Sequence, residues 1–438
     1  MFYGLMPLLA FVMILTPVVF ADEGTESSGG GWWSGLKNSL SNLTSGSFSE
    51  LSAEDVGFKP RVKPHISATS SFNSNANLGK RQKDAAWQGR VAPGITVSIP
   101  SGKLYTEVDY TYGFSTTQGR RSHANINTHN LNALARYDLS ADTIFGVGNN
   151  IQFSEVPGFR PGDTFILETA TAQVKHRVSS KLTAALTDTF QWFQDKSAIS
   201  PTVRNNEFND NGLGLDLTYD VTEDVSVGPS FKWNVRNFEK TRAKDYYQIS
   251  PTVNASYRIG PKTTLTGNFG WAFRDFERGG SESELVYGAS ATHLYGRKLV
   301  WLLSYAKSLV DTFDTSFVFK ERPEATILDN LDRDFRVIKS HRIGTAITYN
   351  LDEKNSFNTF GDVQFLSGDS SDSVAIPPTK NNEKAMEIGV GYSYRLTRYL
   401  SLDLGYSFGR RFSGDNNATG SRNDYTFHKI NAGVNLSV

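Results

Sequence analysis

Charged side chains recur at alternate positions of several apolar segments, and this spacing suggests a chemical role for them. In the segment Met386–Phe408, Glu387, Arg395 and Asp403 occupy polar positions between apolar neighbours. Side chains two residues apart on a β-strand share one face, so such charges line one surface and select solutes electrostatically. The candidate pore-lining residues with this spacing are Glu107, Asp109, Lys232, Arg236, Arg258, Arg274, Arg342, Glu387, Arg395, Asp403 and Lys429.

Four of these candidates are basic and belong to three consecutive predicted strands: Lys232, Arg236, Arg258 and Arg274. On one wall of a pore, these side chains would favour anionic solutes, including uronic-acid sugars. The alternative is that each cation pairs with a carboxylate of the wall and only stabilises it. The sequence leaves both interpretations open.

The sequence shows no pattern typical of an enzyme, a metal site or a cofactor site. The seven histidines lack metal-ligand spacing, and His123 and His129, which share a predicted loop or strand edge, are weak evidence for a metal. The absence of Cys excludes disulfides, thiolate ligands and Cys nucleophiles. No Gly-rich phosphate loop separates a strand from a helix, and no Ser, His and acidic residues cluster. We expect neither catalysis nor a bound cofactor.

The composition fits strands that have one apolar and one polar face. The chain has 438 residues, a formal net charge of 0, 38 glycines, 12% aromatic residues and a mean hydropathy of −0.37. Such a mean is also reached when half of every strand faces lipid and half faces water. The balanced charge provides no basic excess for nucleic-acid binding, so we expect no such partner.

The elements that must position the charges are β-strands. From Met386 to Leu396 apolar and polar residues alternate, and the pattern restarts at Leu400 after the short turn Thr397–Arg398, which is typical of a β-hairpin. From residue 63 onward the same pattern recurs in about eighteen segments, within a range of roughly 16–20. The sequence therefore predicts an all-β fold, a transmembrane antiparallel β-barrel.

The predicted connections alternate in length. Short turns such as Pro100–Gly102 and Gly260–Lys262 face one side, and longer polar loops face the other, as in outer-membrane barrels. One such loop is predicted between strands 103–115 and 129–139. The longest connection, Ser308–Asp334, mixes apolar and acidic residues and is a candidate to fold inward and narrow the pore. Alternatively, it forms an external hairpin or an added pair of strands.

Two segments precede the predicted barrel. Residues 1–21 form an uncharged apolar run ending in Val19-Phe20-Ala21, which predicts a secretory signal peptide, with an uncleaved anchor as the alternative. Residues 22–62 are rich in Gly and Ser and predict a flexible periplasmic arm. The barrel then occupies 63–438 in the bacterial outer membrane, and its expected partners are membrane lipid and the barrel-assembly machinery.

Three segments resemble the β-barrel porins associated with exopolysaccharide and capsule export loci. They are Gly391–Arg411, Asp424–Val438 and the hairpin Tyr246–Glu277. The resemblance implies an outer-membrane pore for a secreted exopolysaccharide, with the polysaccharide and periplasmic export components as partners and no catalytic residues. The alternatives are a diffusion porin for small solutes or sugars, and a structural or adhesive barrel with a blocked lumen.

Overall fold

The computed structural model describes residues 60–74, 85–119, 123–155, 164–195, 207–239, 245–277, 280–296, 298–310, 335–370, 380–413 and 425–438. The predicted signal peptide, the arm up to residue 59 and the Ser308–Asp334 connection beyond residue 310 lie outside these ranges. Among the described residues, no helix is long and apolar enough to cross a membrane.

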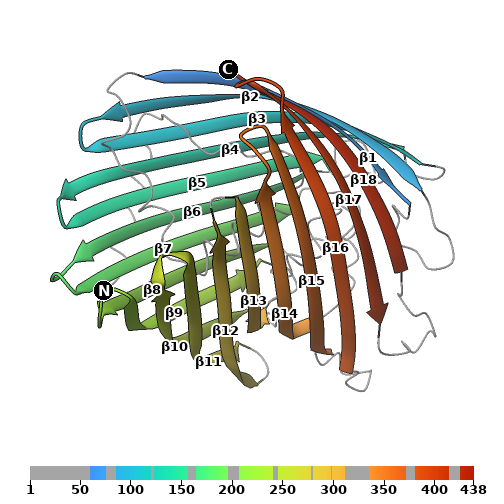
Figure 1. The fold of residues 1–438 in the computed structure, drawn as a ribbon. Coiled ribbons are helices and arrows are strands. Elements are labelled where there is room, and N and C mark those ends of the chain that lie inside the picture. Colours follow the sequence, from blue (N-terminus) through green and yellow to red (C-terminus); the bar gives the residue numbers. More distant parts are fainter. Residues whose placement is uncertain are drawn as a thin grey trace.

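Eighteen antiparallel strands form one closed sheet (Figure 1). They are β1 (Arg61–Asn73), β2 (Ala86–Ser101), β3 (Leu104–Gly119), β4 (His123–Ser140), β5 (Thr143–Glu155), β6 (Thr164–Arg177), β7 (Leu182–Asp195), β8 (Phe208–Asp220), β9 (Val225–Phe238), β10 (Tyr246–Ile259), β11 (Thr263–Phe276), β12 (Ser281–Tyr295), β13 (Leu299–Val310), β14 (Phe335–Asn350), β15 (Asn355–Ser370), β16 (Lys380–Arg395), β17 (Leu400–Ser413) and β18 (Tyr425–Ser437). Sequence neighbours pair throughout, and β1 also pairs with β18, from His65 opposite Ser437 to Asn73 opposite Lys429. This closure confirms the predicted eighteen-stranded barrel.

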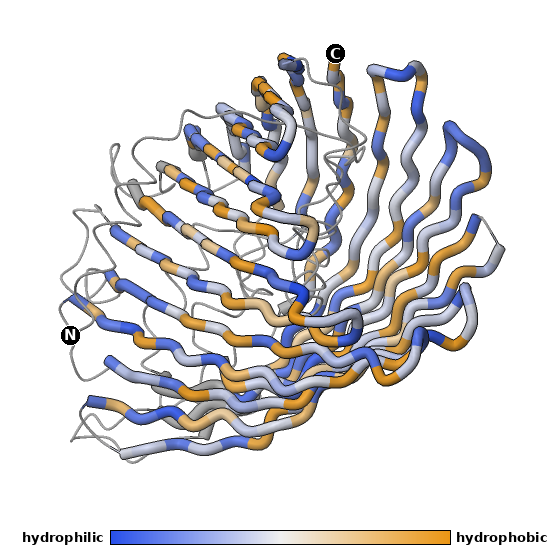
Figure 2. The backbone as a smooth tube through the Cα atoms, turned by 90° about the vertical axis from the view of Figure 1, so that its left-hand side faces the viewer, coloured by the Kyte–Doolittle hydropathy of each residue, from blue (hydrophilic) through white to orange (hydrophobic). Residues whose placement is uncertain are grey.

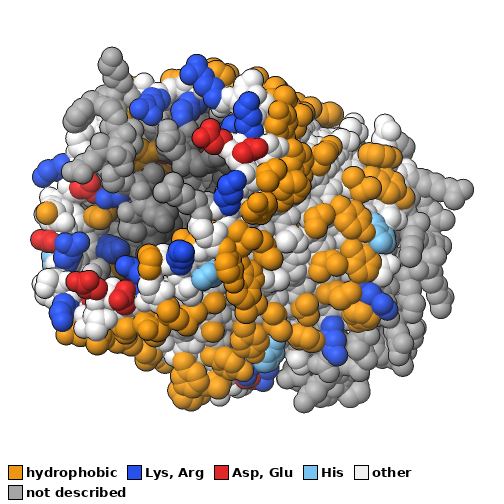
Figure 3. Space-filling view, in the orientation of Figure 1, with side chains coloured by type: hydrophobic (Ala, Val, Ile, Leu, Met, Phe, Trp, Pro, Cys, Tyr) orange, Lys and Arg blue, Asp and Glu red, His pale blue; other side chains and the backbone are white. Residues whose placement is uncertain are grey.

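Each strand has an outward row of exposed, mostly apolar side chains and an inward row of more buried, mostly polar ones. In β16 and β17, Ile388, Val390 and Leu404 are exposed, while Glu387 and Asp403 on the alternate positions are buried. The hydropathy accordingly alternates along the tube of Figure 2, and apolar side chains cover the outer wall in Figure 3. A closed sheet with paired backbone groups and an apolar exterior satisfies the requirements of a bilayer. The protein is a transmembrane β-barrel of the bacterial outer membrane.

Four of the short turns use the same local hydrogen bonds. Ser179, Thr222, Asp352 and Thr397 each accept backbone N–H groups from the residues two and three positions later. These side chains replace ladder hydrogen bonds that the reversing backbone cannot make. At Asp352, the side-chain hydrogen bond from Asn355, together with the backbone donors, holds the pKa of the carboxyl below its usual value.

The opposite end of the barrel departs from the predicted alternation of loop lengths. β3 continues to Gly119 and β4 begins at His123, so most of the loop expected between strands 103–115 and 129–139 is strand. The β11–β12 connection, residues 277–280, is also as short as a turn. The predicted alternation of short turns with longer loops is therefore wrong at these two connections.

Aromatic side chains mark both ends of the outward rows. The exposed Tyr257, Tyr295 and Tyr399 lie near the short turns, as expected for an interfacial belt. Nearer the other end, three tyrosine hydroxyls hydrogen-bond a histidine Nδ1 on the next strand; the pairs are Tyr110–His129 (2.7 Å), Tyr305–His341 (2.9 Å) and Tyr406–His428 (2.9 Å). Tyr246, by contrast, is buried in an inward row against Phe276.

Some of the outward rows contain acidic exceptions. On β7, Asp188 lies between the exposed Leu186 and Phe190, and on β6, Glu168 accepts a hydrogen bond from Asn149 Nδ2 at 3.0 Å. Carboxylates on the lipid-facing wall of a barrel are destabilising. These carboxylates interrupt the apolar pattern of the outer wall.

Candidate functional site

The structure places all eleven candidate charges on inward rows, opposite the exposed apolar side chains of the same strands. Arg236, Arg274, Glu387 and Asp403 are buried. The burial pattern ranks the others as half-buried or exposed: Glu107, Asp109, Arg342 and Lys429 are half-buried, and Lys232, Arg258 and Arg395 are exposed. Burial therefore divides the candidates into charges buried in the wall, half-buried charges and charges with exposed side chains.

Arg236 belongs to the wall. On β9 its guanidinium pairs with Asp210 of β8, and the distances from Nε and Nη2 to Asp210 Oδ2 are 2.7 Å and 2.5 Å. The same group lies 4.4 Å from the centre of the Phe208 ring. Arg236 is only 3% exposed. An arginine in this setting is held by its carboxylate and by a ring, and it contributes little attraction to a passing anion.

Arg274 is held in a similar way by neutral groups. Its Nε and Nη2 donate to Gln248 Oε1 at 2.9 Å and 2.8 Å, and its guanidinium lies 4.1 Å from the centre of the Tyr246 ring. Arg274 is 2% exposed. The hydrogen bonds to the amide oxygen and the contact with the ring face both stabilise the buried guanidinium.

An aromatic strip supports these two arginines across five consecutive strands. Phe193 stacks on Phe208 with ring centres 5.7 Å apart, Phe208 contacts Phe238, and Tyr246 contacts Phe276. All five side chains are buried. They form a packed inner layer and are not exposed for stacking on a solute.

The acidic candidates lie on the other side of the barrel, on β3, β16 and β17, where polar partners hold them. Asp403 accepts hydrogen bonds from Ser393 Oγ at 2.5 Å and Asn435 Nδ2 at 2.6 Å. Asp109 accepts from Thr96 Oγ1 at 2.8 Å and Thr111 Oγ1 at 3.0 Å. These hydrogen bonds disperse the negative charge into the wall.

The remaining acidic groups have tyrosine or arginine partners. Glu107 accepts a hydrogen bond from Tyr105 Oη at 2.9 Å. Arg342 donates to Asp362 of β15, with Nε and Nη2 at 2.7 Å and 2.6 Å from Oδ2. In the strand register, Asp362 lies opposite Glu387, so two acidic positions are neighbours on β15 and β16.

The expected basic wall is thus divided. Lys232 and Arg258 are exposed, but Arg236 and Arg274 are buried and held by the wall. Arg395, exposed on β16, adds a third accessible cation on the opposite side of the barrel. Of the two interpretations left open by the sequence, salt bridging describes Arg236, whereas Lys232 and Arg258 have exposed side chains.

Sequence reasoning missed the partners of these charges. Asp210 and Asp362 are not among the candidates, and nor is an ion-pair group in which Glu284 of β12 contacts Lys307 of β13 and Lys339 of β14. Strand pairing identifies such partners only after the register is known. Within the described residues, no group of three or more His, Asp or Glu side chains is placed to hold a metal.

No family model matches the chain, and no curated protein matches it. Among solved structures, it is similar to OccK5 (OpdH) of Pseudomonas aeruginosa, with 13% identity, 86% of this chain and 98% of that chain covered, and a TM-score of 0.47. It is also similar to the FrpB iron transporter of Neisseria meningitidis (F5-1 variant), with 9% identity, 89% and 83% coverage, and a TM-score of 0.49. Likenesses this weak carry no argument about cargo.

Proposed function

We propose that the protein is a passive outer-membrane pore whose lumen favours anionic solutes. The observation that carries this proposal is the sign of the exposed candidate charges: Lys232, Arg258 and Arg395 are all basic. The acidic candidates are buried or half-buried, and hydrogen-bond donors compensate Glu107, Asp109 and Asp403. Accessible charges set the electrostatic barrier to a solute, so the exposed cations lower that barrier for anions.

Two cargoes are compatible with these cations. The first is an acidic exopolysaccharide leaving the cell, the cargo implied by the resemblance of the sequence to export-associated porins. The second is a small anionic solute or acidic sugar that diffuses through, and the exposed cations favour it equally. Lys232 and Arg258 lie on neighbouring strands and Arg395 lies across the barrel, so both cargoes would meet positive charge on two sides.

The pore is tested by liposome swelling with purified protein. Glucuronate is expected to enter faster than glucose, since only the acid is attracted by the exposed cations. The triple variant Lys232→Gln, Arg258→Gln, Arg395→Gln should lose this preference while still admitting glucose. Equal rates for both sugars in the wild type would refute the anionic preference. No swelling with either sugar would favour the blocked barrel.

The cargo is tested by deleting the gene and measuring surface polysaccharide and biofilm matrix. Loss of matrix, restored by the wild-type gene but not by a variant that fails to conduct, supports export. An unchanged amount of matrix in the deletion strain would refute the export of a polysaccharide and favour the small-solute porin.

A further inference from the structure

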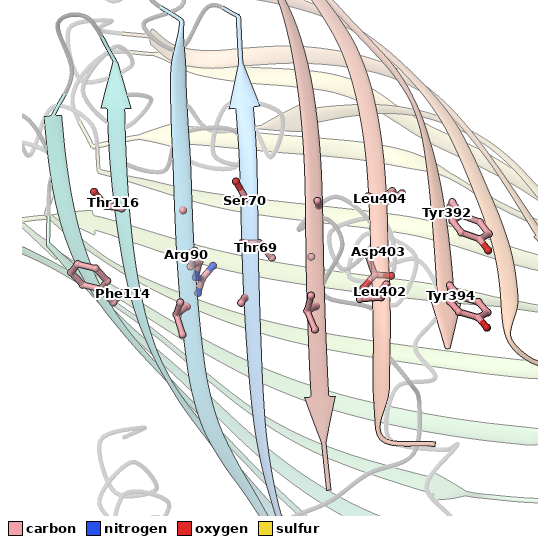
Figure 4. A pocket seen from close by; sticks show the side chains of 16 residues that line it. Thr69, Ser70, Arg90, Phe114, Thr116, Tyr392, Tyr394, Leu402, Asp403 and Leu404 are labelled. Atoms are coloured by element: carbon pink, nitrogen blue, oxygen red, sulfur yellow. The ribbon is translucent and has the colours of Figure 1, made fainter. Parts of the chain in front are cut away.

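A depression of about 610 Å³ lies on the outer wall, over the seam where the first and last strands pair (Figure 4). Its lining follows two cross-strand rows set by the register. One row runs Tyr394, Leu402, Val434, Ala68, Val91 and Phe114, and the other runs Tyr392, Leu404, Ala432, Ser70, Gly89 and Thr116. All twelve belong to outward rows, and the other four lining residues, Thr69, Arg90, Asp403 and Gly433, lie between the two rows. The depression therefore opens to lipid and not to the lumen.

The depression exists because the side chains are small at the seam and large on both sides of it. Ala68, Ser70, Gly89 and Ala432 supply little bulk on β1, β2 and β18. On β16 and β17 the lining includes larger tyrosine and leucine side chains. Phe114 of β3 lines the opposite end of the depression (Figure 4). An apolar hollow left empty would forfeit dispersion contacts along its lining.

The hydrocarbon of the bilayer is the medium that meets this surface, and an acyl chain has the chemistry and flexibility to fill it. At the β16–β17 end, Tyr394 pairs with Leu402 close to the turn 396–399. Arg398 is exposed in that turn, with its guanidinium 4.4 Å from the centre of the Tyr399 ring. A cation beside an interfacial ring is suited to a lipid phosphate.

We propose that this depression binds one acyl chain of an anionic phospholipid of the periplasmic leaflet, whose phosphate pairs with Arg398. The site is structural and independent of transport through the lumen. It anchors lipid over the seam, where nine residue pairs join β1 to β18 and thirteen join β1 to β2.

The test is native mass spectrometry of the detergent-solubilised protein with added dioleoyl phosphatidylglycerol. The wild type is expected to retain one lipid. Ala432→Phe fills the depression from an outward position and should weaken retention about tenfold, as expected for losing contact with two methylenes. Ala255→Phe, on the outward row of β10, is the matched control and should retain lipid like the wild type.

Ser70→Phe provides a second filling variant if Ala432→Phe does not fold, and Arg398→Gln should abolish the preference for phosphatidylglycerol over phosphatidylcholine. Equal retention by wild type and both filling variants overturns the proposal. Equal loss in Ala255→Phe also overturns it, because the effect would not be local. A dimer that the filling variants dissociate would assign the depression to a second copy of the chain and overturn it as well.

Discussion

At the scale of single residues, the buried pair Arg236–Asp210 shows how the lumen holds charge inside its wall. Removing the carboxylate leaves a cation that is 3% exposed without its main partner. Asp210→Asn should therefore destabilise the barrel by about 3–5 kcal/mol. Urea unfolding in lipid vesicles, followed by tryptophan fluorescence, measures the change.

Asp216→Asn is the matched control for this variant, since Asp216 is a half-buried inward aspartate of the same strand. It should change the free energy of unfolding by less than about 0.5 kcal/mol. If Asp210→Asn is as stable as this control, Asp210 does not stabilise the buried Arg236, and the claim that this pair holds the charge within the wall is wrong.

Asp188 leads to the opposite expectation, because it lies in an outward row between Leu186 and Phe190. A carboxylate facing lipid costs free energy, so Asp188→Leu should stabilise the barrel by up to about 2 kcal/mol. The same unfolding assay measures the gain. A loss of stability in this variant would mean that the carboxylate makes a stabilising contact on the outer wall.

At the scale of strands, alternation in the sequence predicted every strand but not where the strands end. In β3 and β4 the residues beyond the apolar alternation, such as Thr117, Gln118 and Asn127–Asn130, are polar on both faces. Beyond the bilayer both faces meet water, so the backbone continues to pair while the hydropathy signal disappears. The predicted loop between residues 115 and 129 was wrong for this reason.

Alternation also predicted that the candidate charges point inward, because alternate residues of a strand point to opposite faces of the sheet. It did not predict their burial or partners. Arg236 and Lys232 have the same parity on one strand, yet the first is buried against Asp210 and the second is exposed. The difference comes from the register with β8 and from the aromatic strip, which are properties of several strands together.

The turns offer a test at this scale. Gly260 opens the β10–β11 turn with φ of 62° and has open space where a Cβ would lie. Gly260→Ala should cost about 1–2 kcal/mol through backbone strain alone. Gly267→Ala within β11 places its Cβ 3.5 Å from Gly288 O, an ordinary contact, and should be neutral or slightly stabilising. Equal unfolding midpoints for the two variants would contradict the strain at Gly260.

At the scale of the whole molecule, the net charge is 0, but the acidic and basic candidate residues differ in how exposed they are. Glu107, Asp109 and Asp403 accept hydrogen bonds within the wall and Glu387 is buried, whereas Lys232, Arg258 and Arg395 are exposed on two sides of the barrel. Under the proposed function, the electrostatics of the pore depend on these exposed cations and not on the total charge.

The reversal potential of single barrels in a planar bilayer under a KCl gradient tests this claim most directly. The wild type is predicted to be anion-selective, and the triple variant Lys232→Gln, Arg258→Gln, Arg395→Gln should shift the reversal potential toward cation selectivity. Arg410→Gln removes one positive charge from the outward row of β17 and should leave the potential unchanged. A cation-selective wild type, or a triple variant with the wild-type reversal potential, would contradict the account.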